Sequence, residues 1–142
     1  MNAKVDFYIL TDDSPLARSQ LVCRLTEKAY QQKQRVYIHA PTKQAAEQIN
    51  QLLWTYRDDT FIPHDLEGND LQPPAPVQIG FQRVPDYRGD ILINLSDAVP
   101  TFYPQFSRLF EIIGNDAAEQ QAARDRYRFY RDNNCELSTH KL

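Results

Sequence analysis

Four arginines stand close together near the end of the sequence, at Arg124, Arg126, Arg128 and Arg131. A guanidinium group is a planar fork of N–H donors, which can hold a carboxylate through two parallel hydrogen bonds. The segment 124–131 contains one acid, Asp125, so it carries a net charge of +3 and leaves −6 on the rest of a chain whose total is −3. This contrast favours one defined anionic partner over broad binding to nucleic acid, which needs a wide positive field.

The arginines fall within a predicted helix from Asp116 to about Asp132. At roughly 100° per residue, the face expected to pack on a sheet is formed by Ala118, Ala122 and Phe129. The nearly opposite face carries the remaining candidates, namely Arg124, Arg128 and Arg131 with Gln120 and Tyr127 beside them. Arg126 is expected to turn toward the protein body, and Arg131 to be a peripheral contact at best.

A predicted strand that ends at Ile112 and Ile113 leads into this helix and offers an apolar wall. Arginines beside Tyr127 and Ile113 suit an acidic peptide with a hydrophobic end, held by its carboxylates. The same pattern is also typical of a solvated charged face, and helical spacing alone does not separate the two interpretations.

A second group of large side chains follows the middle of the chain, at Trp54, Tyr56, Phe61 and Pro63. Aromatic residues around a proline turn can form core that closes a long loop. Exposed tryptophan and phenylalanine are equally typical of anchors for a partner protein. Periodicity leaves both interpretations open.

The first predicted strand-to-helix turn lacks the residues that bind phosphate. It holds Asp12 and Asp13 and none of the four glycines, although nucleotide-binding folds need close backbone approach there. Adjacent acids at a helix start are more simply groups that cap the helix and favour its dipole. No P-loop lysine is present, so the sequence predicts no nucleotide cofactor.

Other catalytic or metal patterns are equally hard to assemble. Ser14 and Ser96 lack a G-x-S-x-G elbow. His64 has no nucleophile placed beside it, and we expect it to fix its loop through a hydrogen bond. The two cysteines and three histidines show no zinc-ligand spacing, and Cys23 lies in an apolar stripe as a small buried hydrophobe. We therefore expect neither a catalytic site nor a metal.

These candidates are positioned by a predicted alternation of strands and helices. Strands are expected at residues 4–10, 35–39, 77–80, 91–95 and, as the last strand, 109–113, with helices at 14–33, 42–56 and 116–132. Residues 57–76 are predicted to be a loop-rich middle, and 104–108 a turn of helix. The opening strand–helix–strand unit predicts a right-handed parallel crossover. We expect an α/β fold: a single three-layer domain over residues 1–142, with a mostly parallel central sheet and a nucleotide-binding-like topology that lacks a phosphate loop.

The composition fits one globular domain, because 42% of residues are hydrophobic and 25% are charged. No apolar run is long enough to cross a bilayer, and the amino terminus shows no secretion signal. The sequence predicts a cytoplasmic protein.

Two motifs are each moderately specific for one protein family, and together they make a convincing match to it. They are Phe61-Ile62-Pro63-His64 and Arg124-x-Arg126-Tyr127-Arg128-x-Tyr130-Arg131. Further matches at residues 5–8, 53–54, 75–79 and 90–95 extend the likeness over nearly the whole chain. With these motifs the sequence resembles the chi subunit family of bacterial DNA polymerase III, accessory proteins of the clamp loader.

This resemblance implies a small non-catalytic adaptor in DNA replication. Members of the family bind the acidic, hydrophobic-ended C-terminal tail of single-stranded DNA-binding protein (SSB), and on the opposite side they bind the psi subunit. They thus link the clamp loader to SSB-coated template and contact DNA indirectly, through SSB.

The resemblance also implies site residues. The family's tail pocket corresponds to Arg124, Tyr127 and Arg128, with Ile113 as its apolar wall, and Gln120 stands where some relatives carry a lysine. The psi surface, shared in some members with a helicase-like protein, corresponds to Trp54, Phe61 and Pro63.

Two other classes of function remain as alternatives. The arginine face could bind single-stranded nucleic acid directly, with Tyr127 stacking on a base, although the acidic remainder of the chain counts against it. A nucleotide-dependent enzyme would be stabilised by its nucleotide, but the missing phosphate loop disfavours it.

Overall fold

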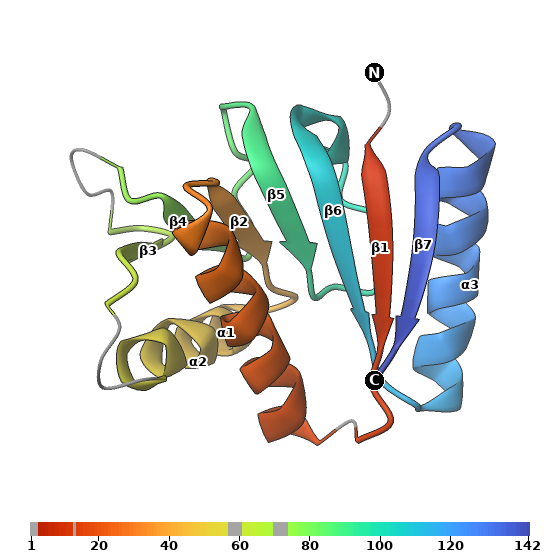
Figure 1. The fold of residues 1–142 in the computed structure, drawn as a ribbon, viewed down its shortest axis with the longest axis horizontal. Coiled ribbons are helices and arrows are strands. Elements are labelled where there is room, and N and C mark those ends of the chain that lie inside the picture. Colours follow the sequence, from red (N-terminus) through yellow and green to blue (C-terminus); the bar gives the residue numbers. More distant parts are fainter. Residues whose placement is uncertain (1–2, 13, 57–60, 70–73) are drawn as a thin grey trace.

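One sheet of seven parallel strands forms the centre of the molecule (Figure 1). The structure, a computed structural model, describes residues 3–12, 14–56, 61–69 and 74–142. The order across the sheet is β3-β4-β2-β5-β6-β1-β7. The strands are β1 (Lys4–Ile9), β2 (Val36–His39), β3 (His64–Leu66), β4 (Val77–Gly80), β5 (Gly89–Asn94), β6 (Phe106–Ile113) and β7 (Glu136–Lys141).

Within the described residues, three α-helices connect these strands, and each begins at a side chain that accepts a backbone N–H. The helices are α1 (Pro15–Gln31), α2 (Lys43–Thr55) and α3 (Ala117–Asp132), and a short 3-10 helix, η1 (Tyr103–Gln105), precedes β6. The caps are Ser14, Thr42 and Asp116. Such caps satisfy N–H groups that have no partner within the helix, which explains why the predicted helix starts are correct.

The two faces of the sheet carry separate hydrophobic clusters. One cluster joins α1 and α2 to alternate strand residues such as Ile38, Ile93 and Ile112. The other joins α3 and η1 to the intervening residues, including Phe7 and Leu109. Since a parallel sheet is buried on both faces by its crossover helices, this arrangement confirms the predicted three-layer α/β class, and every strand pairing is parallel.

Two strands depart from the prediction. Residues 109–113 are not the last strand, because β7 follows α3 and pairs in parallel with β1. Within the predicted loop-rich middle, β3 forms a three-residue edge strand beside β4. Both are edge strands with few apolar residues, so neither shows the apolar run that marks a central strand.

The segment between β5 and β6 also differs in detail. The predicted helical turn at 104–108 is present as η1, but it ends at Gln105 and β6 begins at Phe106, before the expected residue 109. The strand β6 matters for the site because it carries Glu111 and Ile113 beneath α3.

Candidate functional site

A groove with a volume of about 460 Å³ opens between α3 and the edge of the sheet. From α3 it is lined by Gln120, Ala123, Arg124, Tyr127, Arg128 and Arg131. From the strands it is lined by Phe7 and Ile9 of β1, Ile113 of β6, and Thr139 and Lys141 of β7. The structure therefore brings together all five residues predicted for the tail pocket: Ile113, Gln120, Arg124, Tyr127 and Arg128.

The floor of the groove is apolar and aromatic. Phe7 and Ile113 are almost fully buried, each 3% exposed, while Tyr127 on α3 remains 38% exposed. The rings of Phe7 and Tyr127 lie 5.4 Å apart between centroids. A buried wall with a half-open aromatic ring above it can take up a single apolar side chain from a partner.

The rim of the groove is cationic. Arg124, Arg128, Arg131 and Lys141 surround the apolar floor. The contacts that hold the arginines are long and exposed: Arg128 Nη1 lies 3.5 Å from Asp125 Oδ1, and Arg131 Nε lies 3.3 Å from Asp132 Oδ1. Exposed pairs of this kind contribute little free energy, so these guanidinium groups can exchange their present partners for a ligand carboxylate at small cost.

A buried polar network fixes α3 to the sheet directly beneath this rim. Glu111 of β6 is 0% exposed and lies 3.1 Å from the guanidinium Nε of Arg126. The hydroxyl of Tyr130 donates to Glu111 at 2.6 Å, and the amide of Asn94 donates to it at 3.0 Å. Arg126 also donates to the carbonyl of Asp97 at 2.9 Å. These directional bonds set the rotation of α3, and thereby which residues face the groove.

Burial governs the ionisation of this network. It raises the pKa of Glu111, while Arg126, Tyr130 and Asn94 oppose that rise by favouring the carboxylate. Burial and the adjacent carboxylate of Glu111 together raise the pKa of Tyr130 well above its usual range. The phenol is therefore a hydrogen-bond donor at neutral pH.

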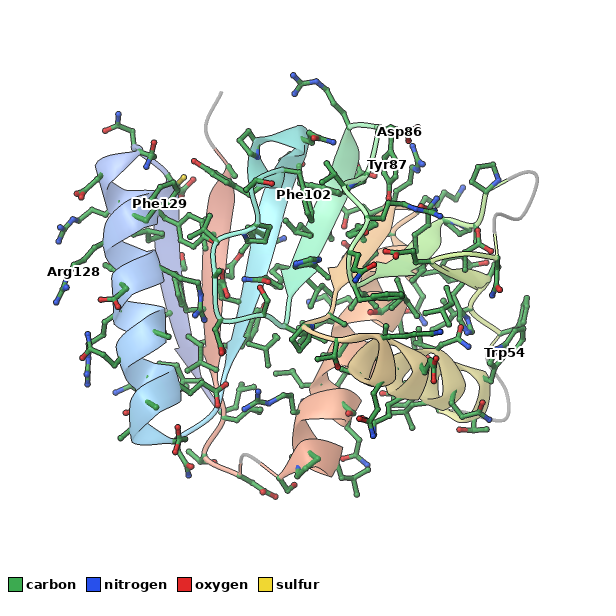
Figure 2. The ribbon with its side chains drawn as sticks, turned by 180° about the vertical axis from the view of Figure 1, so that it is seen from behind. Trp54, Asp86, Tyr87, Phe102, Arg128 and Phe129 are labelled. Atoms are coloured by element: carbon green, nitrogen blue, oxygen red, sulfur yellow. The ribbon has the colours of Figure 1, made fainter. Side chains whose placement is uncertain are left out.

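The packing face of α3 differs from the prediction. Its buried residues are Ala123, Arg126 and Tyr130, whereas Phe129, which was expected to pack on the sheet, is 43% exposed. Figure 2 shows Phe129 on the α3 side of the molecule and Arg128 pointing outward from the helix. The prediction was wrong because the face that meets the sheet is set by a contact with a distant strand, where Arg126 and Tyr130 bond to Glu111 of β6. Its expectation that Arg126 turns toward the protein body is confirmed.

Two lining residues from β7 were missed. Thr139 and Lys141 line the groove because β7 pairs with β1, and the sequence prediction placed no strand after α3. The available signal was the alternation of Leu137, Thr139 and Lys141, whose side chains face α3 while those between them face away. Arg131, expected to be peripheral, lies among the lining residues as well.

The second predicted surface lies near the opposite edge of the sheet. Trp54, in the last turn of α2, is 53% exposed and Phe61 is 62% exposed, with ring centroids 5.5 Å apart. Pro63 is half-buried beside them. These exposures exclude the interpretation of Trp54 and Phe61 as core, and an exposed aromatic pair of this kind is typical of a contact surface.

His64 supports that aromatic surface from below. Its ring lies 4.6 Å from Trp54 between centroids, and its two nitrogens lie 2.7 Å from the carbonyl of Ile62 and 3.1 Å from that of Asn50. The expectation that His64 fixes its loop is thus confirmed. Cys23 is fully buried, as expected of a small hydrophobe.

Several polar groups of the protein bond to one another at the place where a nucleotide would bind in such a fold. This is the crevice at the carboxyl ends of β1 and β6, from which the connections leave in opposite directions. The N–H of Gly114 donates to Glu119 at 3.0 Å, and Glu119 pairs with Arg18 at 2.8 Å. Asp12, one of the two predicted capping acids, accepts the N–H of Ser14 at 3.1 Å, and Asp13 lies outside the described residues.

The described part of the chain has no candidate metal cluster and no helix that could span a membrane. It contains no group of three or more histidine, cysteine, aspartate or glutamate side chains arranged to hold a metal ion. None of its helices is both long and apolar enough to cross a membrane.

The fold and the groove together define an α/β protein with a cationic, aromatic groove at one edge of its sheet and an exposed aromatic pair toward the other. Comparison with known proteins adds the family. The sequence profile described as "DNA polymerase III chi subunit, HolC" matches residues 2–138, and the chain belongs to the DNA polymerase III chi subunit family.

Similar proteins support this assignment over almost their full lengths. The chain is 41% identical over 139 residues to the DNA polymerase III subunit chi of Pseudomonas aeruginosa. This alignment covers 98% of the chain and 96% of that protein. It is 30% identical over 138 residues to the subunit chi of Escherichia coli strain K12, with 94% of each chain covered. The subunit chi of Haemophilus influenzae is also 30% identical, over 143 residues and 99% of its length.

Proposed function

We propose that this chain is a non-catalytic accessory subunit of the DNA polymerase III holoenzyme, which holds the acidic C-terminal tail of SSB during DNA replication. Through the psi subunit it links the clamp loader to SSB, and it contacts DNA indirectly, through SSB. It needs no cofactor for this role, and its place of action is the cytoplasm.

The observation that carries the proposal is the pairing of a cationic rim with an apolar floor in one groove. Arg124 and Arg128 hold carboxylates of the tail, including its terminal one, through charge-assisted hydrogen bonds. Tyr127 and Ile113 pack against its last apolar side chains, which lie over the buried wall described above. Gln120 offers a neutral amide at the entrance, where it can donate to the tail without adding charge.

The psi subunit is proposed to bind the surface of Trp54, Phe61 and Pro63, which a helicase-like protein could also use. Support comes from the exposure of the two aromatic rings and from their distance from the groove. Figure 2 shows Trp54 and Arg128 at opposite sides of the molecule. Both partners can therefore be bound at once, as an adaptor requires.

A direct test is the titration of an acidic, hydrophobic-ended SSB tail peptide against the full chain and Arg124→Ala, by fluorescence anisotropy. We expect the variant to bind about tenfold more weakly, because a hydrogen bond to a charged group is lost. Binding to the native chain should also weaken as salt rises, since the contacts are exposed to screening. Arg88→Ala, which removes an exposed arginine that does not line the groove, serves as the matched control.

Equal affinity of Arg124→Ala and the native chain would contradict the assignment of the groove. The same variants should be tested in gel shifts with a single-stranded oligonucleotide in the absence of SSB. Shifts that depend on Arg124 and Tyr127 would instead support direct binding to single-stranded nucleic acid.

A further inference from the structure

The two edges of the sheet are protected very differently. At one edge, β3 is only three residues long, His64–Leu66. At the other, β7 is six residues long, contains no proline and, among the described residues, pairs only with β1. A long edge strand presents unpaired N–H and C=O groups to any extended chain that reaches it, and short strands or prolines are the usual protection.

The hydrogen bonds between β7 and β1 show which backbone groups face outward. The N–H of Glu136 donates to the carbonyl of Ala3 at 3.3 Å, and the N–H of Leu142 donates to that of Ile9 at 3.0 Å. In a parallel ladder every second residue of a strand bonds to the same neighbour. The intervening residues, Leu137, Thr139 and Lys141, therefore direct their N–H and C=O groups away from β1, toward the free edge.

The free edge and the groove share residues. Thr139 and Lys141, whose backbone groups face the edge, also line the groove with their side chains. Both residues are exposed. A peptide that leaves the groove across these two side chains consequently meets unpaired backbone donors and acceptors without a gap between the two surfaces.

The charge around this edge selects the kind of peptide. Lys141, at the carboxyl end of β7, lines the groove and is exposed, and Arg124 and Arg128 of α3 line the same groove. The one acid on β7, Glu136, stands at the opposite end of the strand. An acidic segment is thus favoured beside the carboxyl end of β7, and it should be extended because only an extended chain can pair with a strand.

From these observations we infer that the free edge of β7 is a second part of the tail site, where an acidic segment preceding the tail's last residues pairs as an eighth strand. This inference rests on the proposed function, since it takes the groove as the place where the tail ends. It assigns binding of the tail's main chain to the N–H and C=O groups of Thr139 and Lys141, in addition to the side-chain contacts in the groove.

Amide hydrogen exchange, followed by nuclear magnetic resonance on the full chain, tests the inference directly. Two SSB tail peptides are compared at saturation: one of about four residues, enough for the groove, and one of about ten, long enough to run along the roughly 20 Å of β7. We expect the longer peptide to slow exchange at the amides of Thr139 and Lys141, because they become hydrogen-bonded, and the short one to leave them unchanged. Unchanged exchange with the longer peptide bound would overturn the inference.

A pair of variants separates main-chain from side-chain effects. Thr139→Pro removes one outward N–H, which is tolerated at an edge strand, whereas Thr139→Val keeps that N–H and nearly the same side-chain shape. Because Thr139 also lines the groove, each variant is judged by the ratio of its affinities for the longer and the short peptide. We expect this ratio to be about fivefold lower for Thr139→Pro than for Thr139→Val, since only the proline variant lacks the outward N–H. Equal ratios for Thr139→Pro and Thr139→Val would count against strand pairing.

These outcomes are distinct from those that test the groove itself. If the short peptide binds in a way that depends on Arg124 while the longer one protects no β7 amide, the proposed function stands and the strand pairing fails. If neither peptide binds, the proposed function fails. Should Thr139→Pro not fold, the exchange measurement on the native chain still decides.

Discussion

Arg126 is the residue on which the shape of the groove most depends, although it does not line it. The residue is 4% exposed, and its guanidinium balances the fully buried Glu111. A buried pair need not add to stability as a whole, but removing one partner leaves an uncompensated charge. The role of Arg126 is therefore to fix the orientation of α3, and with it the positions of Arg124, Tyr127 and Arg128.

We predict that Arg126→Met lowers the free energy of unfolding by about 3 kcal/mol at neutral pH. Arg124→Met, the same change at an exposed position of the same helix, should alter it by less than about 0.5 kcal/mol. Urea unfolding of both variants, followed by circular dichroism, measures the difference. Similar losses in the two variants would show that the Glu111 network does not hold α3.

The loss in free energy of unfolding caused by Arg126→Met should also depend on pH. Burial already raises the pKa of Glu111, and loss of the guanidinium removes a contribution that lowers it. A carboxyl group whose pKa is raised on folding keeps its full contribution to stability below its unfolded pKa of about 4.3 and loses it as the pH rises through the folded pKa. The variant should therefore be closer to the native chain near about pH 5 than near about pH 8.

Among the elements, those with local signals were predictable from the sequence. The helices are marked by the caps Ser14, Thr42 and Asp116 and by apolar spacing, and their starts were found. The strand β7 could not be predicted in this way. An edge strand that is covered on one side needs few apolar residues, and the pairing of β7 with β1 joins distant parts of the chain. The unexpected exposure of Phe129 also has a distant cause. The rotation of α3 is set by Glu111 on β6, the buried partner that turns Arg126 inward.

The residues of the candidate site also divide into those that the sequence predicted and those that only the structure revealed. The α3 residues and Ile113 could be named from helical spacing and family motifs, while Thr139 and Lys141 became visible only once β7 was placed. For Trp54 and Phe61 the sequence left core and surface equally open. Their exposure is decided by how α2 and β3 lie at the edge of the sheet, which no local pattern records.

The start of α3 provides a prediction for the element that carries the groove. Asp116 caps the helix by accepting the N–H of Glu119 at 3.1 Å. We expect Asp116→Ala to lower the free energy of unfolding by about 1 kcal/mol, because an N–H group of the first turn loses its acceptor. Asp116→Asn retains an acceptor and is the matched control, with a loss of at most a few tenths of a kcal/mol. Thermal and urea unfolding measure both, and equal stability of the two variants would show that the cap is dispensable.

The whole molecule separates its two candidate surfaces by the width of the sheet. β7 and β3 are the outermost of seven strands, and six spacings of roughly 4.8 Å place these edges about 30 Å apart. The groove lies at the β7 edge and the aromatic pair near the β3 edge, and they share no residue. A rigid sheet between two sites is suited to holding two partners at a fixed separation, with no need for a conformational change.

We accordingly predict that the two surfaces act independently. Arg124→Ala should weaken the SSB tail and leave psi binding unchanged, and Trp54→Ala should do the reverse, because residues this far apart with no shared partners have additive effects. The double variant should show the sum of the two losses in free energy. Isothermal titration of the tail peptide, with and without psi already bound, measures the coupling directly. A change in tail affinity of more than about threefold on psi binding would mean that the sheet transmits a signal between its edges, and the molecule would then be a switch instead of a passive link.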